Sequence, residues 1–142
     1  MKILVPLDGS TCSETAITWA RFIALKTGAS ITLLRSYLPF QDVHLAPQLP
    51  ITVAELVNDE GQEKEINEYL TGKAGEFGEL EVTTRCAQGS AAQCILESAG
   101  EADLIVMATH GRGFISHAVM GSTTERVLRR APCPVLVVPE RR

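Results

Sequence analysis

Short apolar runs alternate along this 142-residue chain with longer segments in which apolar residues recur at helical spacing. The runs are Ile3 to Leu7, Ser30 to Tyr37, Glu81 to Ala87, Leu104 to Ala108 and Val135 to Val138. Apolar runs of this length predict strands that are buried on both faces of a sheet. The third run is more polar and the last follows Pro134, so we expect these two strands at the edges of the sheet.

The segments between these runs carry the helical pattern. They lie after Thr11, at about residues 51 to 75, after Ser90, and from Thr123 to Arg130. Three of them open with Ser/Thr-x-x-Glu/Gln, which predicts a capping box whose first residue is Thr11, Ser90 or Ser122. Gly28 is expected to end the first helix. The acidic second segment is expected to break near Gly61 and to turn its glutamates to solvent.

The alternation of strands and helices predicts the fold. It is typical of an α/β protein with three layers, α/β/α, around a five-stranded parallel sheet of Rossmann-like winding. Residues 1–142 are expected to form a single domain of this kind. In such sheets a ligand lies outside the carboxyl ends of the strands, where the winding reverses. If the first and fourth strands are neighbours, the segments that follow them line the same crevice.

Composition excludes several classes of protein. Hydrophobic residues make up 45% of the chain and charged residues 21%, which is typical of a folded globular protein and not of a disordered one. No apolar run approaches the roughly 20 residues that span a bilayer, so no membrane association is expected. The apolar stretch between Met1 and Asp8 is too short for a signal peptide, and we therefore expect a cytoplasmic protein.

Metal and nucleic-acid partners are not expected either. The cysteines show no C-x-x-C spacing and no clustering with histidine; they are Cys12, Cys86, Cys94 and Cys133. From Arg112 onward six arginines stand against Glu125 and Glu140, which is a basic balance. This basic segment lacks the interleaved aromatic residues of a nucleic-acid surface, and arginines near the end of a helix also complement its dipole.

The stretch that follows the fourth apolar run is the strongest candidate for a binding site. A strand, a loop that contains Gly111, and a helix that starts near Gly121 place unpaired backbone N–H groups and a helix N-terminus at the edge of the sheet. Such an arrangement binds anions, and phosphate is the anion expected here. Asp8 lies at the end of the first strand and is expected at the same crevice.

Each candidate also has a structural interpretation. The glycines serve equally well to turn the chain, and Ser122 serves either as a helix cap alone or as a cap and a phosphate ligand. Asp8 is a binding residue or the start of an Asx turn. His110 is suited to acid–base work but has no partner in the sequence, and Arg112 either meets a phosphate or lies in solvent.

After the fourth apolar run the chain has the motif Ala108-x2-Gly111-x9-Gly121-Ser122. This motif resembles the signature Gly-x2-Gly-x9-Gly-Ser/Thr of the universal stress protein family, and the resemblance extends over the whole length of the chain. The resemblance implies a homodimer through the strand 135–138 and a site for ATP or another adenine nucleotide, with or without Mg2+. It places Asp8 near the adenosine and Gly121 and Ser122 on the phosphates. The full set of candidate nucleotide-binding residues is Pro6, Asp8, Ser36, Met107, Ala108, His110, Gly111, Arg112, Gly121, Ser122 and Thr123.

The resemblance implies a cytoplasmic regulatory protein of the stress response that acts by binding a nucleotide; the sequence names no protein partner. No catalytic residue is assigned, because the chain has no P-loop lysine and no second acidic residue at metal-site spacing. Two alternatives stay open. One is a slow ATPase that uses the same loop. The other is a nucleotide-free dimeric adaptor, which is favoured by Ala108 in place of the first signature glycine and by Ser36 where an apolar residue is usual.

Overall fold

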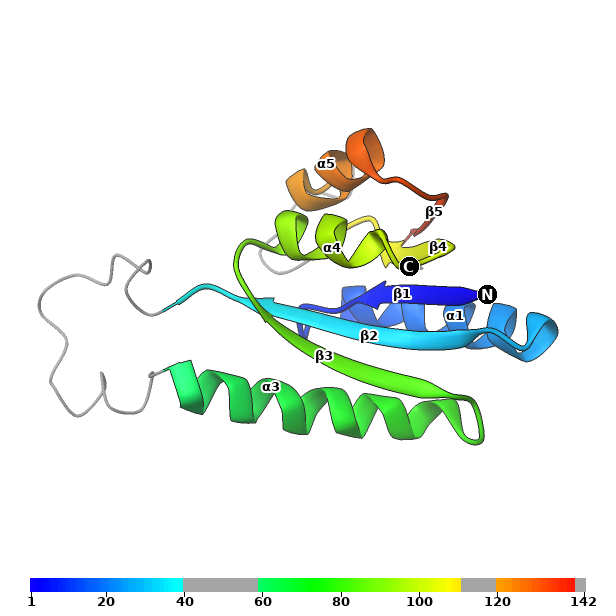
Figure 1. Ribbon diagram of the computed structural model, residues 1–142, viewed down its shortest axis with the longest axis horizontal. Coiled ribbons are helices and arrows are strands. Elements are labelled where there is room, and N and C mark those ends of the chain that lie inside the picture. The colour runs from blue at the N-terminus through cyan, green and yellow to red at the C-terminus, as the bar shows by residue number, and fades with distance from the viewer. Residues whose placement is uncertain (40–58, 111–119, 140–142) are drawn as a thin grey trace, which may run out of the picture.

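The computed structural model describes residues 1–39, 59–110 and 120–139. Its strands are β1 (Lys2–Pro6), β2 (Ser30–Tyr37), β3 (Val82–Gln88), β4 (Leu104–Ala108) and β5 (Val135–Val138). Its helices are α1 (Thr11–Thr27), α3 (Asp59–Ala74), α4 (Ala91–Ala99) and α5 (Ser122–Arg130), with a short 3₁₀ helix, η2 (Gly75–Phe77), after α3. The expected alternation of strands and helices is confirmed (Figure 1).

The strands form one five-stranded sheet in the order β3-β2-β1-β4-β5, and every pairing is parallel. The first and fourth strands are therefore neighbours, which meets the condition for a shared crevice, and the expected edge positions of the third and last strands are confirmed. The chain winds from β1 toward β3 on one side and resumes with β4 on the other. The winding therefore reverses between β1 and β4.

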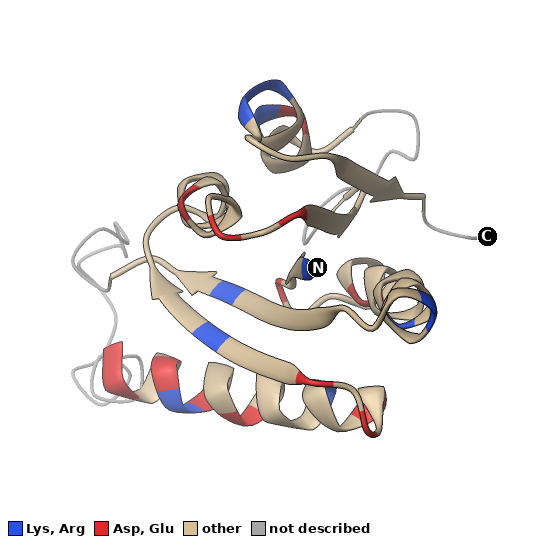
Figure 2. Ribbon diagram, turned by 45° about the vertical axis from the view of Figure 1, so that its right-hand side comes forward, with Lys and Arg blue, Asp and Glu red and all other residues tan. Residues whose placement is uncertain are grey.

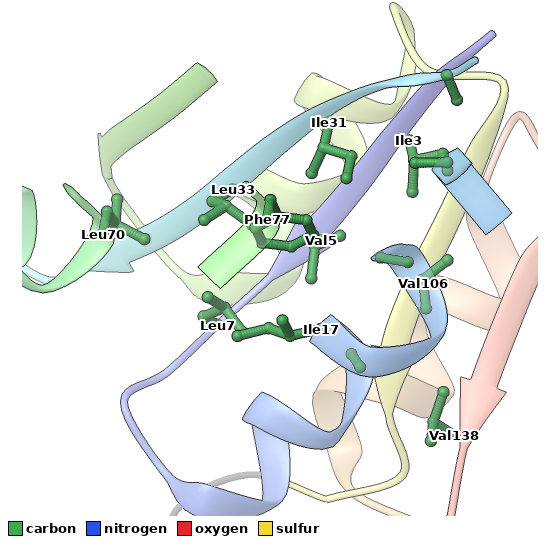
Figure 3. Packing of buried hydrophobic residues seen from close by; sticks show 14 of the residues in the cluster. Ile3, Val5, Leu7, Ile17, Ile31, Leu33, Leu70, Phe77, Val106 and Val138 are labelled. Carbon is green, nitrogen blue, oxygen red and sulfur yellow. The ribbon is translucent and has the colours of Figure 1, made fainter. Parts of the chain in front are cut away.

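Helices cover both faces of the sheet. One hydrophobic cluster joins Ile3, Val5 and alternate residues of β2 to the buried faces of α1 and α3 (Figure 3). A second cluster joins Leu4 and Ile105 to α4 and α5 on the opposite face. Because successive side chains of a strand point to opposite faces, a central strand buried on both sides has to be apolar throughout. The predicted three-layer α/β/α fold is confirmed.

The acidic segment forms a continuous helix in the part that the structure describes. Helix α3 runs from Asp59 to Ala74 without a break at Gly61, so the expected interruption there is wrong; residues 51–58 lie outside the described residues. Ile66 and Leu70 are buried, whereas the glutamates of α3 are exposed. Figure 2 marks the acidic positions of this helix in red. The burial of one apolar stripe against β2 and β3 accounts for the helix despite its glycine.

Two helix caps differ from the sequence prediction by one residue. Ser10, not Thr11, caps α1, because its hydroxyl oxygen accepts a hydrogen bond from Ser13 N at 3.1 Å. Gly121, not Ser122, is the N-cap of α5, and no side chain caps that end. Ser90 is the N-cap of α4 as expected, without a side-chain bond to the helix. Gly28 ends α1 in the left-handed region, at φ 69°, which confirms its predicted role.

Candidate functional site

A cavity of about 590 Å³ lies at the carboxyl ends of β1, β2 and β4, where the winding of the sheet reverses. Every residue of the predicted site that the structure describes lines it: Pro6, Asp8, Ser36, Met107, Ala108, His110, Gly121, Ser122 and Thr123. Gly111 and Arg112 lie outside the described residues. Residues from distant parts of the chain thus meet in one place because the parallel strands all end at the same edge.

The cavity has further walls that sequence reasoning missed. Arg35 and Tyr37 flank Ser36 at the end of β2, while α3 and α4 add side chains from either face of the sheet. The lining residues outside the predicted set are Leu7, Ser13, Leu34, Arg35, Tyr37, Gln62, Glu65, Ile66, Ala91, Ile95 and Thr124. Arg35 and Tyr37 could have been predicted as lining residues, because they lie at the carboxyl end of a predicted strand. The residues of α3 and α4 reach the cavity only through tertiary packing.

Asp8 organises the turn between β1 and α1. Its Oδ1 accepts hydrogen bonds from Ser10 N at 2.9 Å and from Ser10 Oγ at 2.6 Å, which is an Asx turn. Ser13 Oγ in turn accepts a hydrogen bond from Asp8 N at 3.3 Å. The Asp8 carboxylate thereby positions the Ser10 hydroxyl that caps α1. Asp8 itself also lines the cavity. The two interpretations of Asp8 made from the sequence are therefore compatible.

The start of α5 is held against the end of β4. Gly121 N donates to Thr109 O at 3.0 Å, and the buried Thr124 hydroxyl donates to Ala108 O at 3.1 Å. Gly121 has φ −62°, so its role is not to supply a left-handed turn. A Cβ at this position would lie 3.3 Å from Thr109 O, which is closer than an ordinary contact. The glycine therefore permits the backbone of the helix N-terminus to approach β4, and the first turn of α5 borders the cavity.

Ala108 fits its position in the strand. It is buried, it pairs with Val138 of β5 in the parallel ladder, and no non-glycine residue of the described chain has a positive φ. A methyl group at a strand position with negative φ causes no backbone strain. The exchange of the first signature glycine for alanine is thus tolerated by the backbone here.

Two tyrosines connect the β2 side of the cavity to the neighbouring helices. The Tyr37 hydroxyl donates a hydrogen bond to the Glu63 carboxylate, and this bond, together with burial, raises the pKa of Tyr37 to about 12. The Tyr69 hydroxyl donates a hydrogen bond to Glu14 Oε1 at 2.9 Å. Burial is the larger cause, and this bond the second, of the raised pKa of Tyr69. Both rings therefore stay neutral at physiological pH and join α3 to β2 and to α1.

The described residues contain no group of three or more His, Cys, Asp or Glu side chains placed to hold a metal ion. In residues 1–39, 59–110 and 120–139, no helix has both the length and the apolar composition needed to cross a membrane.

The sequence model of the universal stress protein family matches residues 1–139. A universal stress protein of Methanocaldococcus jannaschii is 35% identical over 143 residues, which cover 96% of this chain and 81% of that protein. One of Thermus aquaticus is 33% identical over 138 residues, with 96% of both chains covered. A third relative, from Mycolicibacterium smegmatis, is 30% identical over 97% of this chain; the chain spans only 45% of that protein's length.

Solved structures of universal stress proteins have the same fold. UspA from Lactobacillus plantarum superposes with a TM-score of 0.74 at 26% identity, and the match covers 97% of both chains. A universal stress protein in complex with cAMP superposes with a TM-score of 0.65 at 26% identity, over 98% of this chain and 96% of that one.

Proposed function

Because the chain belongs to the universal stress protein family, a family of stress-response proteins, we propose that it is a regulatory protein that binds an adenine nucleotide in the cavity at the carboxyl ends of β1, β2 and β4. One observation carries the proposal. The described residues of the predicted site come from three separate parts of the chain, and all of them line this cavity. Its volume of about 590 Å³ lies within the range of ligand pockets.

In this proposal the first turn of α5 binds the phosphates. Gly121, Ser122 and Thr123 border the cavity there, and the first-turn N–H groups of a helix are unpaired and carry the positive end of its dipole. Gly111 and Arg112 are proposed to complete the phosphate site. The adenosine lies toward Asp8 and Ser36, with Pro6, Met107, Ala108 and His110 around it.

The proposed ligand is ATP or another adenine nucleotide, with or without Mg2+. A universal stress protein of similar fold was solved in complex with cAMP, which supports an adenine nucleotide as the ligand class. We expect binding without rapid turnover. No lysine is among the described residues that line the cavity, and no metal-ligating cluster is present in the described part of the chain. Binding without transition-state stabilisation does not accelerate hydrolysis.

The proposed assembly is a homodimer that forms through β5. Among the described strands, β5 pairs only with β4, so its other edge has no strand partner in the described part of the chain. Val135, Leu136 and Val137 are half-buried, and the strand is apolar throughout. An apolar strand edge of this kind pairs readily with a second copy. We expect the dimer to act in the cytoplasm and to signal through a protein partner that remains to be identified.

Ligand identification tests the proposal. The purified protein is denatured, the released small molecules are identified by mass spectrometry, and the stripped protein is titrated calorimetrically with ATP, cAMP and GTP. We expect binding of an adenine nucleotide and weaker binding of GTP. If no nucleotide is released and none binds, the protein is the nucleotide-free adaptor. A steady-state ATP turnover of about 1 per second or faster, within the usual range of enzymes, would instead identify an ATPase.

A further inference from the structure

The cavity contains one permanent cation among the described residues that line it, and this is Arg35. Arg35 lies near the carboxyl end of β2 and is half-buried. Its alternate neighbours Leu33 and Tyr37 pack in the hydrophobic cluster with α1 and α3. Because side chains alternate along a strand, Arg35 projects on that same face of the sheet.

The Arg35 guanidinium is held by an aromatic ring and not by a carboxylate. Its Cζ lies 5.0 Å from the centroid of the Tyr69 ring, which is a cation–π contact. The ring itself is anchored, because the Tyr69 hydroxyl donates to Glu14 Oε1 at 2.9 Å. The other carboxylate oxygen of Glu14 accepts a hydrogen bond from Lys73 Nζ at 2.9 Å. The nearest acidic group on α1 is thus already paired with a different cation.

Within the described part of the chain Arg35 makes no hydrogen bond and no ion pair. A guanidinium carries five N–H donors in a planar fork that matches the oxygens of a phosphate. Here Arg35 lines a ligand-sized cavity while its guanidinium carbon lies over the Tyr69 ring. The arrangement leaves the donors available to an anion in the cavity.

The sheet register gives the position of this cation relative to α5. Pro6 of β1 pairs with Leu34 of β2, and Leu4 of β1 pairs with Ile105 of β4. Continued to the ends of the strands, these registers bring Arg35 and Ala108 to the same level on either side of β1. They are separated by two interstrand spacings, or about 10 Å. Ala108 in turn is bonded to the first turn of α5 through Thr124.

We propose that Arg35 forms a second anion subsite, which receives a phosphate esterified to the O2′ or O3′ of the ribose. The proposal rests on the proposed function, in which α5 binds the 5′-phosphates and the adenosine lies near Asp8. Arg35 lies on the far side of β1 from α5, next to the proposed position of the adenosine. Because adenine and ribose are neutral, Arg35 meets an anion there only if the ribose carries a second phosphate. Asp8 and Glu65 also line the cavity and repel a phosphate, and the positive charge of Arg35 offsets this repulsion.

The matched ligands for a test are AMP, adenosine 2′,5′-bisphosphate and adenosine 3′,5′-bisphosphate, which differ only in the second phosphate. Calorimetric titration of the wild-type protein is expected to show that one bisphosphate binds at least about tenfold more tightly than AMP, as for an added charge-assisted hydrogen bond. Arg35→Gln should reduce that ratio to one or below, while AMP affinity changes little. Arg35→Lys, which keeps the charge but loses the fork, should retain part of the preference.

Arg85→Gln is the matched control. Arg85 lies on the neighbouring strand β3, where it pairs with Leu34 of β2; it is exposed and does not line the cavity. This variant therefore makes the same change in net charge outside the site. It should keep the wild-type preference. If wild type binds AMP and the bisphosphates equally, or if Arg35→Gln keeps the preference, the Arg35 subsite is wrong and the nucleotide site stands. If wild type binds none of these nucleotides and no ATP, the proposed function fails as well.

Discussion

The N–H of Gly121 donates to Thr109 O at 3.0 Å, and a Cβ on Gly121 would lie 3.3 Å from that same oxygen. The Thr109 carbonyl therefore both joins α5 to the end of β4 and crowds any side chain at position 121. Since the φ of Gly121 is −62°, the restriction comes from the neighbouring carbonyl and not from the backbone conformation. The first turn of α5, which is proposed to bind phosphate, depends on this approach.

Gly121→Val is expected to abolish nucleotide binding while the far-ultraviolet circular dichroism stays that of a folded protein. The added bulk has to displace the junction of β4 and α5, at a cost to stability of about 1–3 kcal/mol. Gly121→Ala should show a smaller effect of the same kind. Gly72→Ala is the control, because Gly72 lies within α3 and a Cβ there meets nothing within 4 Å. Wild-type affinity for ATP in Gly121→Val would place the phosphates elsewhere.

Ser122 and Thr124 are expected to separate binding from stability. Ser122 is exposed and caps nothing, so Ser122→Ala should leave the free energy of unfolding within about 0.5 kcal/mol of wild type. It should weaken ATP binding by about 1 kcal/mol, the usual contribution of one hydrogen bond. Thr124→Val removes the buried bond to Ala108 O and should lower stability by about 1–2 kcal/mol. Chemical denaturation and calorimetry give the two quantities; a large loss of stability in Ser122→Ala would contradict this assignment.

Asp8→Ala is expected to weaken the binding of adenosine as well as that of ATP, because Asp8 is proposed to act at the nucleoside end of the ligand. The variant also removes the acceptor of both Ser10 bonds, so a loss of stability of about 1 kcal/mol is expected from the turn and cap. Ser10→Ala is the matched control, since it removes the cap but keeps the carboxylate. Equal losses of adenosine affinity in both variants would show that Asp8 acts only through the turn.

Val137→Lys is expected to shift the protein from dimer toward monomer. Val137 lies on the edge strand β5 and is half-buried, so a charge there opposes pairing with a second copy. Sedimentation velocity or light scattering at tens of micromolar would measure the change. Thr83→Lys, on the opposite edge strand β3, is the control and should leave the oligomeric state unchanged. A monomeric wild-type protein would contradict the proposed assembly.

The strands and their layers were predictable because burial on both faces demands continuous apolar runs. Ile3, Leu4 and Val5 belong alternately to two clusters on opposite faces of the sheet. A continuous apolar run of this length is buried completely only in a central strand that is covered on both faces. The two edge strands were also predictable, from the polar third run and from Pro134. Where the helices begin was less certain. The Ser10 cap depends on the Asp8 side chain, and a four-residue capping pattern does not contain that information.

By itself, then, the sequence determined the α/β fold, the family and the set of segments that meet at the carboxyl edge of the sheet. It also identified Gly121 as a residue of the site, either at the start of the anion-binding helix or as a glycine that turns the chain. Only the tertiary structure decided that Gly121 is close to Thr109 O and that Arg35, which lines the cavity, lies over the Tyr69 ring. Both facts are distances between residues far apart in the chain. Local periodicity reports which face of an element is buried, but not which side chain from another element lies opposite it.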